Sequence, residues 1–180
     1  MGFDGTTSRH HESRPDVAKA LCTERKQLVL GIGNVLLGDD GVGVRLTEQL
    51  RGLEPSLPSR YIDGGTLSFS LLSHLEEAAA LLVIDAADLG AAPGTVQVFE
   101  DEAMDRFLAK SRRRSVHEVG LCDLLDMARL RDCLPPRRAL LSVQPAVIDW
   151  SESLSPLVAD AIEGALAQAL AVLRRWNATP

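Results

Sequence analysis

The sequence contains little cysteine and no excess of positive charge. Only three cysteines occur in 180 residues, at Cys22, Cys122 and Cys133, and no two of them form a C-x-x-C pair. An odd number without that pair argues against a disulfide framework and against a structural zinc site. The net charge of −6 makes nucleic acid and anionic membranes unfavourable partners.

Long apolar runs and targeting segments are also missing. No apolar run reaches the roughly 18 residues that a membrane span needs, and the polar N-terminal stretch lacks the apolar core of a signal peptide. We therefore expect a cytoplasmic protein that binds neither membrane nor nucleic acid. Residues 1–26 lack a sustained period and are expected to form a flexible extension, whereas residues 27–180 are long enough for one domain with its own core.

Alternation between apolar segments and helical patterns predicts an α/β fold. Strands are expected at 28–32, 60–62, 81–84, 95–99 and 139–143, and helices at 42–53, 67–78, 115–130 and 155–175. The turn at 92–94 is too short for a right-handed crossover, so the strand after it should run antiparallel to the strand before it. Together the elements predict a three-layer α/β/α sandwich around a mostly parallel, five-stranded sheet with one antiparallel strand.

Two of the expected helices begin at capping signals. Ser115 and Glu118 form an S-x-x-E capping box at the start of one helix. Ser155 followed by Pro156 is typical of an N-cap residue with proline at the first helical position. These signals fix where the last two helices are expected to start.

Acidic residues follow three of the expected parallel strands. Asp39 and Asp40 lie in a glycine-rich loop after the first strand, Asp63 follows the second, and Asp85 follows the third. The carboxyl ends of parallel strands share one edge of the sheet, which is where α/β proteins build their sites. Each acid alone is equally typical of a helix cap or a turn. Carboxylates gathered at one edge, however, repel one another unless a positive group such as a metal ion is bound among them.

His117 is the candidate nitrogen ligand for such a metal. It lies in the first turn of an expected helix, where the helix dipole disfavours the imidazolium and so favours the neutral, metal-binding form. Two carboxylates and an imidazole suit a divalent transition metal better than Ca²⁺ or Mg²⁺, but these ligand types do not select nickel from zinc. A histidine with a purely structural role is the alternative interpretation.

Two other classes of site fit the sequence less well. Gly31 and Gly33 begin a G-x-G-x-x-G pattern, but Leu36 occupies the position of the third glycine, and two acids lie where a pyrophosphate would bind. A serine hydrolase is disfavoured because no G-x-S-x-G motif is present. Cys122 fits a core cysteine better than a nucleophile.

Five stretches of the chain resemble the hydrogenase maturation endopeptidases. In chain order they are GIGNVLLGDDGVGV from Gly31, DGGT from Asp63, VIDAAD from Val83, HEVGL from His117 and VQPAVIDW from Val143. The resemblance extends from about residue 27 to the end of the chain. It implies a hydrolase, a metal-assisted endopeptidase of aspartate type, that removes the C-terminal peptide of the [NiFe] hydrogenase large-subunit precursor after nickel has been inserted.

The resemblance also implies roles for individual residues. Nickel, supplied by the bound precursor, would be recognised through Asp40, Asp85 and His117, and Asp63 would be a further acid of the site. The family often has glutamate at the position of Asp40. Asp39 stays open between a catalytic role and bracing of the loop. The alternative function is that of a non-enzymatic chaperone, which would bind the precursor or its metal without cutting it.

Overall fold

A computed structural model describes residues 26–53, 57–66, 69–111 and 116–178, without the side chains of residues 69, 111 and 116–119. Five strands form one sheet in the order β2-β1-β3-β5-β4. Their bounds are β1 Lys26–Ile32, β2 Ser59–Gly65, β3 Ala78–Ala86, β4 Val96–Glu100 and β5 Arg137–Val143. All neighbouring strands are parallel except β4, which pairs antiparallel with β5. The predicted sheet is confirmed, and the antiparallel strand lies beside β5 rather than beside β3.

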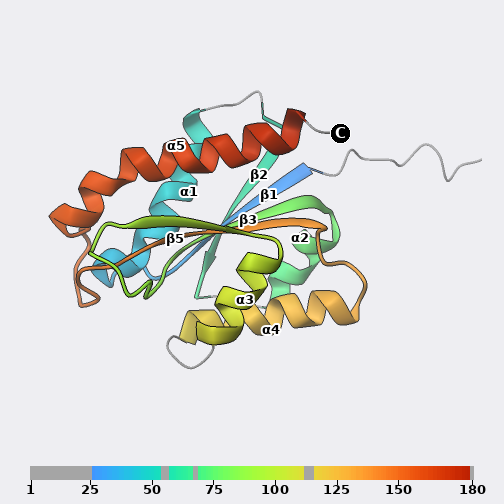
Figure 1. The fold of residues 1–180 in the computed structure, drawn as a ribbon, viewed down its shortest axis with the longest axis horizontal. Coiled ribbons are helices and arrows are strands. Elements are labelled where there is room, and N and C mark those ends of the chain that lie inside the picture. Colours follow the sequence, from blue (N-terminus) through green and yellow to red (C-terminus); the bar gives the residue numbers. More distant parts are fainter. Residues whose placement is uncertain (1–25, 54–56, 67–68, 112–115, 179–180) are drawn as a thin grey trace, which may run out of the picture.

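Helices cover both faces of the sheet (Figure 1). One face carries the helices α1 (Val42–Leu53) and α5 (Pro156–Ala178), and the other carries α2 (Leu72–Glu76), α3 (Glu102–Ser111) and α4 (Val116–Leu130). Short 3-10 helices, η2 (Gly38–Gly41) and η3 (Phe69–Leu71), precede α1 and α2. The predicted three-layer α/β/α sandwich is therefore confirmed.

The core is divided into two apolar clusters, one on each face of the sheet. Leu30 and Val83 belong to the cluster under α2, α3 and α4, whereas Val29 and Ile84 belong to the cluster under α1 and α5. This division follows from the alternation of side chains along each strand. It also determines which face each acid at the carboxyl edge points toward.

Three predicted elements differ from the structure. The helix expected at 67–78 is shorter, because η3 and α2 end at Glu76 and β3 already begins at Ala78. The helix α3 was not predicted at all. The expected extension, residues 1–26, lies outside the described residues apart from Lys26, which begins β1. The capping box of Ser115 and Glu118 also lies outside the described side chains.

The unpredicted helix α3 is held by ion pairs to distant segments. Asp105 accepts hydrogen bonds from Arg138 of β5, at 2.5 and 3.1 Å, and from Arg129 of α4, at 2.8 Å. The hydrogen bonds from Arg138 hold the pKa of the Asp105 carboxyl below its ordinary value, although burial opposes the shift. The partners of α3 lie 24 and 33 residues away in the chain, so a reading of local sequence does not find them.

The last helix, α5, begins as predicted. The Val158 N–H donates to the Ser155 hydroxyl at 3.4 Å, next to Pro156 at the first helical position. By length and composition, α5 is the one helix of the described chain that is apolar enough to cross a membrane, with a mean hydropathy of 1.5. Of the most apolar part of α5, 28% is buried in the structure, and Val158, Leu173 and Trp176 pack against the sheet.

Close packing of α1 on the sheet depends on Gly43. A Cβ atom at Gly43 would lie 2.2 Å from the carbonyl oxygen of Ile84 and 2.4 Å from that of Ile32. Both contacts are to backbone, which cannot move aside as a flexible side chain would. The absence of a side chain at Gly43 therefore lets the start of α1 lie directly on the ends of β1 and β3.

We predict that Gly43→Ala destabilises the fold by about 1–3 kcal/mol, the usual cost of overpacking a core. Gly52, in the same helix, has nothing within 4 Å of its ideal Cβ position. Gly52→Ala is the matched control, and we expect it to stabilise the chain by about 0.5–1 kcal/mol through helix propensity. Urea denaturation followed by circular dichroism measures both variants. Equal stability of the two variants would contradict this account of the packing.

Candidate active site at the carboxyl edge of the sheet

The loop after β1 is closed tightly around Asp40. Gly33 has φ of +126°, and a Cβ atom there would lie 1.8 Å from the Asp40 carbonyl oxygen, so only glycine fits. The Asn34 N–H donates to the Asp40 carboxylate at 2.7 Å. Asp40 is 6% exposed and lies in η2, immediately before α1. The glycine-rich loop thus holds a buried carboxylate at the end of β1.

Asp85 is the second buried carboxylate at this edge. It is the penultimate residue of β3 and is 2% exposed. Alternation along the strand places its side chain on the same face as Val83, which is the face covered by α4. The turn η2 contacts β3, and Gly43 touches the carbonyl of Ile84, the residue before Asp85. Asp40 and Asp85 therefore lie on two elements that are in direct contact.

Asp63 is placed differently from these two acids. It is exposed, and its carboxylate accepts a hydrogen bond from the Gly65 N–H at 2.8 Å, which holds the turn at the end of β2. Its neighbours Tyr61 and Ile62 pack into the clusters on opposite faces, so alternation puts Asp63 on the face of α1, opposite to Asp85. The structure thus places Asp40 and Asp85 on contacting elements at the carboxyl edge and gives Asp63 a turn-forming hydrogen bond.

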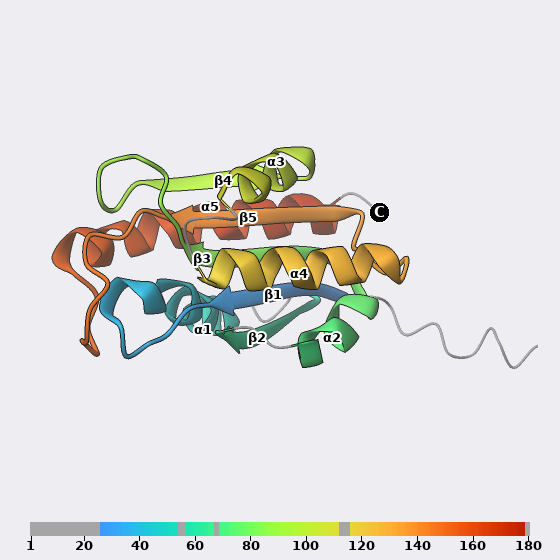
Figure 2. The same ribbon diagram turned by 90° about the horizontal axis from the view of Figure 1, so that it is seen from below.

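His117 is the second residue of α4, and its side chain lies outside the described part of the structure. The helix leads into β5, which runs parallel to β3, so α4 must begin at the carboxyl edge of the sheet. In Figure 2 this start of α4 lies at the end of the molecule toward which β1 points. His117 therefore belongs to a helix that begins at the carboxyl edge and covers the face of the sheet on which Asp85 lies. Within the described residues, no group of three or more His, Cys, Asp or Glu side chains is arranged to hold a metal.

Asp39, the neighbour of Asp40, binds a segment more than 100 residues away. Its carboxylate accepts hydrogen bonds from the N–H groups of Ala146, Val147 and Ser155, at 2.9, 3.0 and 2.7 Å, and from the Ser155 hydroxyl at 2.8 Å. Asp39 is fully buried, at 0% exposure. With four donors on its two oxygens, this carboxylate links the loop after β1 to the segment between β5 and α5. Asp39 could have had a catalytic role or could have braced the loop, and this geometry supports the bracing role.

The environment of Asp39 keeps it ionised. Burial alone raises the pKa of the carboxyl, but the hydrogen bonds from Val147, Ser155 and Ala146 together outweigh burial, and the pKa lies below its ordinary value. Hydrogen bonds to the charged form of a carboxyl act in this direction. The brace is therefore a carboxylate near neutral pH.

Two residues of the edge were not singled out from the sequence. The side-chain oxygen of Gln144, just after β5, accepts hydrogen bonds from the Leu89 N–H at 2.7 Å and the Ala91 N–H at 3.4 Å, and so positions the loop that follows Asp85. Ser142 is fully buried, and its register partner in β3 is Asp85. The QP dipeptide that follows β5 was the available sequence signal for Gln144. Ser142 could be recognised only from the strand register, which pairs it with Asp85.

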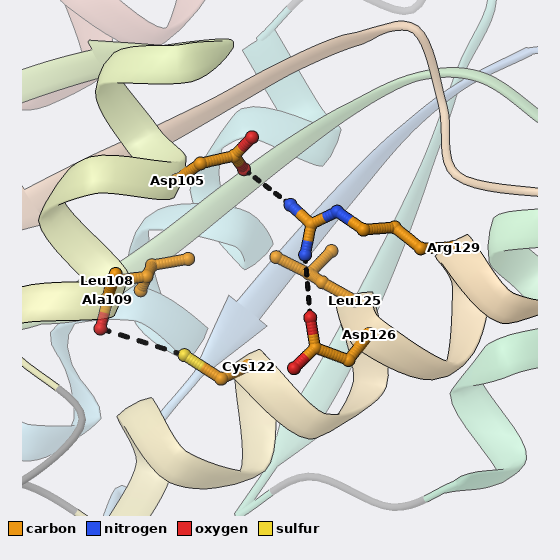
Figure 3. A pocket seen from close by; sticks show the side chains of 7 residues that line it. All are labelled: Asp105, Leu108, Ala109, Cys122, Leu125, Asp126 and Arg129. Atoms are coloured by element: carbon orange, nitrogen blue, oxygen red, sulfur yellow. Dashed lines mark hydrogen bonds and ion pairs between the residues drawn. The ribbon is translucent and has the colours of Figure 1, made fainter.

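A separate cavity of about 400 Å³ lies between α3 and α4 (Figure 3). The guanidinium of Arg129 lies between the carboxylates of Asp105 and Asp126, at 2.8 Å from each. Cys122 is buried here as predicted, and its thiol lies 3.7 Å from the Leu108 carbonyl oxygen. Because each ionic group of this wall has an opposite charge beside it, the cavity offers no chemistry comparable to the buried acids at the sheet edge.

Comparison with known proteins matches this geometry to a family. Residues 44–172 match the model of the hydrogenase maturation protease family. The chain belongs to this family. A hydrogenase expression/formation protein, HupD of Rhodobacter capsulatus, is 42% identical over 153 residues, which cover 83% of this chain and 72% of the relative. The hydrogenase 2 maturation protease of Escherichia coli is 36% identical over 150 residues, covering 82% of this chain and 90% of that protein.

Solved structures agree with the family assignment. The hydrogenase maturating endopeptidase HybD from E. coli superposes with a TM-score of 0.77 at 35% identity, covering 83% of this chain and 93% of that chain. The family supports the role of a processing endopeptidase, that is, a hydrolase of peptide bonds. In this member of the family, three acids are buried at the carboxyl edge of the sheet: Asp39, which braces the loops, and Asp40 and Asp85.

We predict that Asp39→Asn lowers the free energy of unfolding at pH 7 by about 1–3 kcal/mol, because an amide nitrogen cannot accept the donated hydrogen bonds. Because the pKa of Asp39 is lower in the folded state, its ionisation stabilises the fold. This stabilisation is complete above the ordinary pKa of 3.8 and is lost as the pH falls through the folded-state pKa. The difference in the free energy of unfolding between wild type and Asp39→Asn should therefore become smaller at acidic pH. Urea denaturation between pH 7 and pH 3 measures it.

The control for this prediction is Asp160→Asn, an exposed aspartate on α5. We expect it to change stability by less than about 0.5 kcal/mol at every pH. If the free energies of unfolding of wild type and Asp39→Asn differed by the same amount at every pH, Asp39 would not be the ionised brace described above.

Proposed function

We propose that this protein is the endopeptidase that removes the C-terminal peptide of a [NiFe] hydrogenase large-subunit precursor after nickel insertion. Its relatives are named for hydrogenase formation and maturation, and two of them are named as a protease or an endopeptidase. The observation that carries the proposal is the pair of buried carboxylates, Asp40 and Asp85, on contacting elements at one sheet edge. The precursor is a transient partner, and the reaction takes place in the cytoplasm.

We further propose that the enzyme recognises the nickel ion of the precursor as part of its substrate. If the two buried carboxylates face each other across these contacting elements, they repel, and a cation between them removes that repulsion. Asp40 and Asp85 would supply oxygen ligands, and His117 at the start of α4 would supply a nitrogen. This mixed donor set suits a divalent transition metal. A precursor without nickel would lack the positive charge that these acids bind.

The proposed reaction is hydrolysis of one peptide bond of the precursor. The substrate's nickel acts as a Lewis acid that polarises the scissile carbonyl, and water adds to the carbonyl carbon. The C–N bond then breaks, leaving a new carboxylate on the large subunit and a free amine on the released peptide. Asp39 is assigned no proton transfer, because its oxygens already accept four hydrogen bonds.

We expect Asp40→Asn and Asp85→Asn each to lower the rate of precursor cleavage by at least about 100-fold, the usual loss when a charge-stabilising group is removed from an active site. His117→Ala should have a similar effect. Asp63→Asn should cost less than tenfold, because Asp63 lies on the other face and holds its own turn. The intact mass of the nickel-loaded precursor after incubation with each variant measures the cleavage.

The matched control for cleavage is again Asp160→Asn, which we expect to cleave at the wild-type rate. If wild type binds the nickel-loaded precursor but leaves its mass unchanged, the alternative role of a maturation chaperone is favoured. Normal cleavage by Asp85→Asn would remove Asp85 from the proposed site.

A further inference from the structure

Large apolar side chains are exposed on the two loops beside the buried acids. Val35 and Leu36, in the loop after β1, are 38% and 44% exposed, and Val147, Ile148 and Trp150, after β5, are 55%, 55% and 79% exposed. We call these five residues the edge patch. Exposed apolar groups that gather in one place mark interaction surfaces more often than isolated ones do.

The two loops of the edge patch are joined to each other. A parallel bridge links Leu37 to Ser151, with hydrogen bonds from the Gly38 N–H to the Ser151 carbonyl at 2.8 Å and from the Ser151 N–H to the Leu36 carbonyl at 3.0 Å. The Asp39 N–H also donates to the Val147 carbonyl at 3.2 Å. The patch is therefore presented by a braced backbone, which lowers the entropy that binding would cost.

The edge patch is continuous with the candidate active site. Leu36 lies four residues before Asp40 in the same closed loop, and Val147 donates its N–H to Asp39. Figure 2 shows the loops after β1 and β5 meeting at the end of the molecule toward which β1 points. A chain bound with its scissile bond near Asp40 and Asp85 would therefore have to pass beside this patch.

One further exposed apolar side chain, Leu157 at the start of α5, lies at the same edge, whereas two others lie far from it. Leu53 ends α1 and is 53% exposed, and Leu130 ends α4 and is 82% exposed. Both helices begin at the carboxyl edge, so these residues lie at the opposite, amino edge of the sheet. Leu130 therefore offers a control as exposed as Trp150 but far from the acids.

The charged residues of the two loops that carry the edge patch are all acidic. Asp149 lies between Ile148 and Trp150, and Glu152 follows two residues later; both are exposed. One nearby cation, Arg45 of α1, donates hydrogen bonds to the carbonyl oxygens of Val35 and Glu152 and keeps its charge, so it offsets only part of the negative charge of these acids. A partner segment that complements this surface is apolar and carries basic residues at its flank.

We propose that the edge patch binds an apolar segment, flanked by basic residues, of the precursor that the enzyme cleaves, with Trp150 as the main anchor. This inference rests on the proposed function, because it names the substrate as the occupant. Aromatic side chains that become buried dominate the binding energy of many interfaces. The patch thereby supplies affinity for the protein substrate, while the buried acids supply recognition of its metal.

The first test measures binding without turnover. With the nickel-free precursor, which we expect the enzyme to leave uncut, Trp150→Ser should weaken binding at least about tenfold relative to wild type, the usual loss on removing an aromatic anchor. Leu130→Ser should bind the same precursor within twofold of wild type. Equal binding by the Trp150→Ser and Leu130→Ser proteins would overturn the proposal. The affinity of wild type should also fall as salt is raised.

The second test needs no substitution, so it holds even if Trp150→Ser fails to fold. The chain contains two tryptophans, Trp150 and the buried Trp176 of α5, which is 9% exposed. After labelling with 5-fluorotryptophan, fluorine NMR should show the Trp150 resonance shifting when unlabelled precursor is added, while that of Trp176 stays in place. An unmoved Trp150 resonance in the presence of bound precursor would contradict the proposal.

Other occupants of the patch give distinct outcomes. A Trp150 resonance that shifts with the concentration of the enzyme alone would assign the patch to a second copy of this chain and overturn the substrate assignment. Failure of the proposed function appears differently: wild type would leave the precursor mass unchanged even though the Trp150 resonance shifts. Binding and cleavage are thus tested by separate readouts.

Discussion

The buried carboxylate of Asp39 is the constraint on which the functional edge of this protein depends. It accepts four hydrogen bonds from residues 146–155, a segment that is distant in the chain. A buried charge is tolerated only when it is fully hydrogen-bonded, so the two loops must be correctly joined for the fold to be stable. The same contacts fix the loop after β1, which carries Asp40 and part of the edge patch, and the loop after β5, which carries the rest of the patch.

Adjacent acids therefore have different tasks. Asp39 uses its charge to hold the backbone together, and Asp40, fixed by the Asn34 N–H, is held at the edge next to the end of β3. Close approach is made possible by Gly33 and Gly43, where any side chain would collide with backbone. The glycine-rich loop thus holds one buried carboxylate at the edge of the sheet, on an element that contacts β3, the strand of Asp85.

The sequence predicts the elements whose signals are local. The strand β1, the helix α1 and the helix α5 were found from apolar periodicity and an N-cap, and the acids were found from their positions at strand ends. The helix α3 was missed although part of its signal is local, since Met104, Phe107 and Leu108 recur at helical spacing on its buried face. Only its ion pairs to Arg129 and Arg138 required the tertiary structure. The strand β4 was given the correct direction, but its neighbour β5 comes later in the chain. The face of Asp63 and the partners of Asp39 required the strand register and the packing of loops, which no local pattern contains.

The most direct test of the account compares one substrate in two states. The large-subunit precursor is incubated with the wild-type protein, once loaded with nickel and once free of it, and its intact mass is measured over time. Loss of a C-terminal peptide from the nickel-loaded form alone is the predicted result. Equal trimming of both forms would contradict the claim that Asp40 and Asp85 recognise the metal of the substrate.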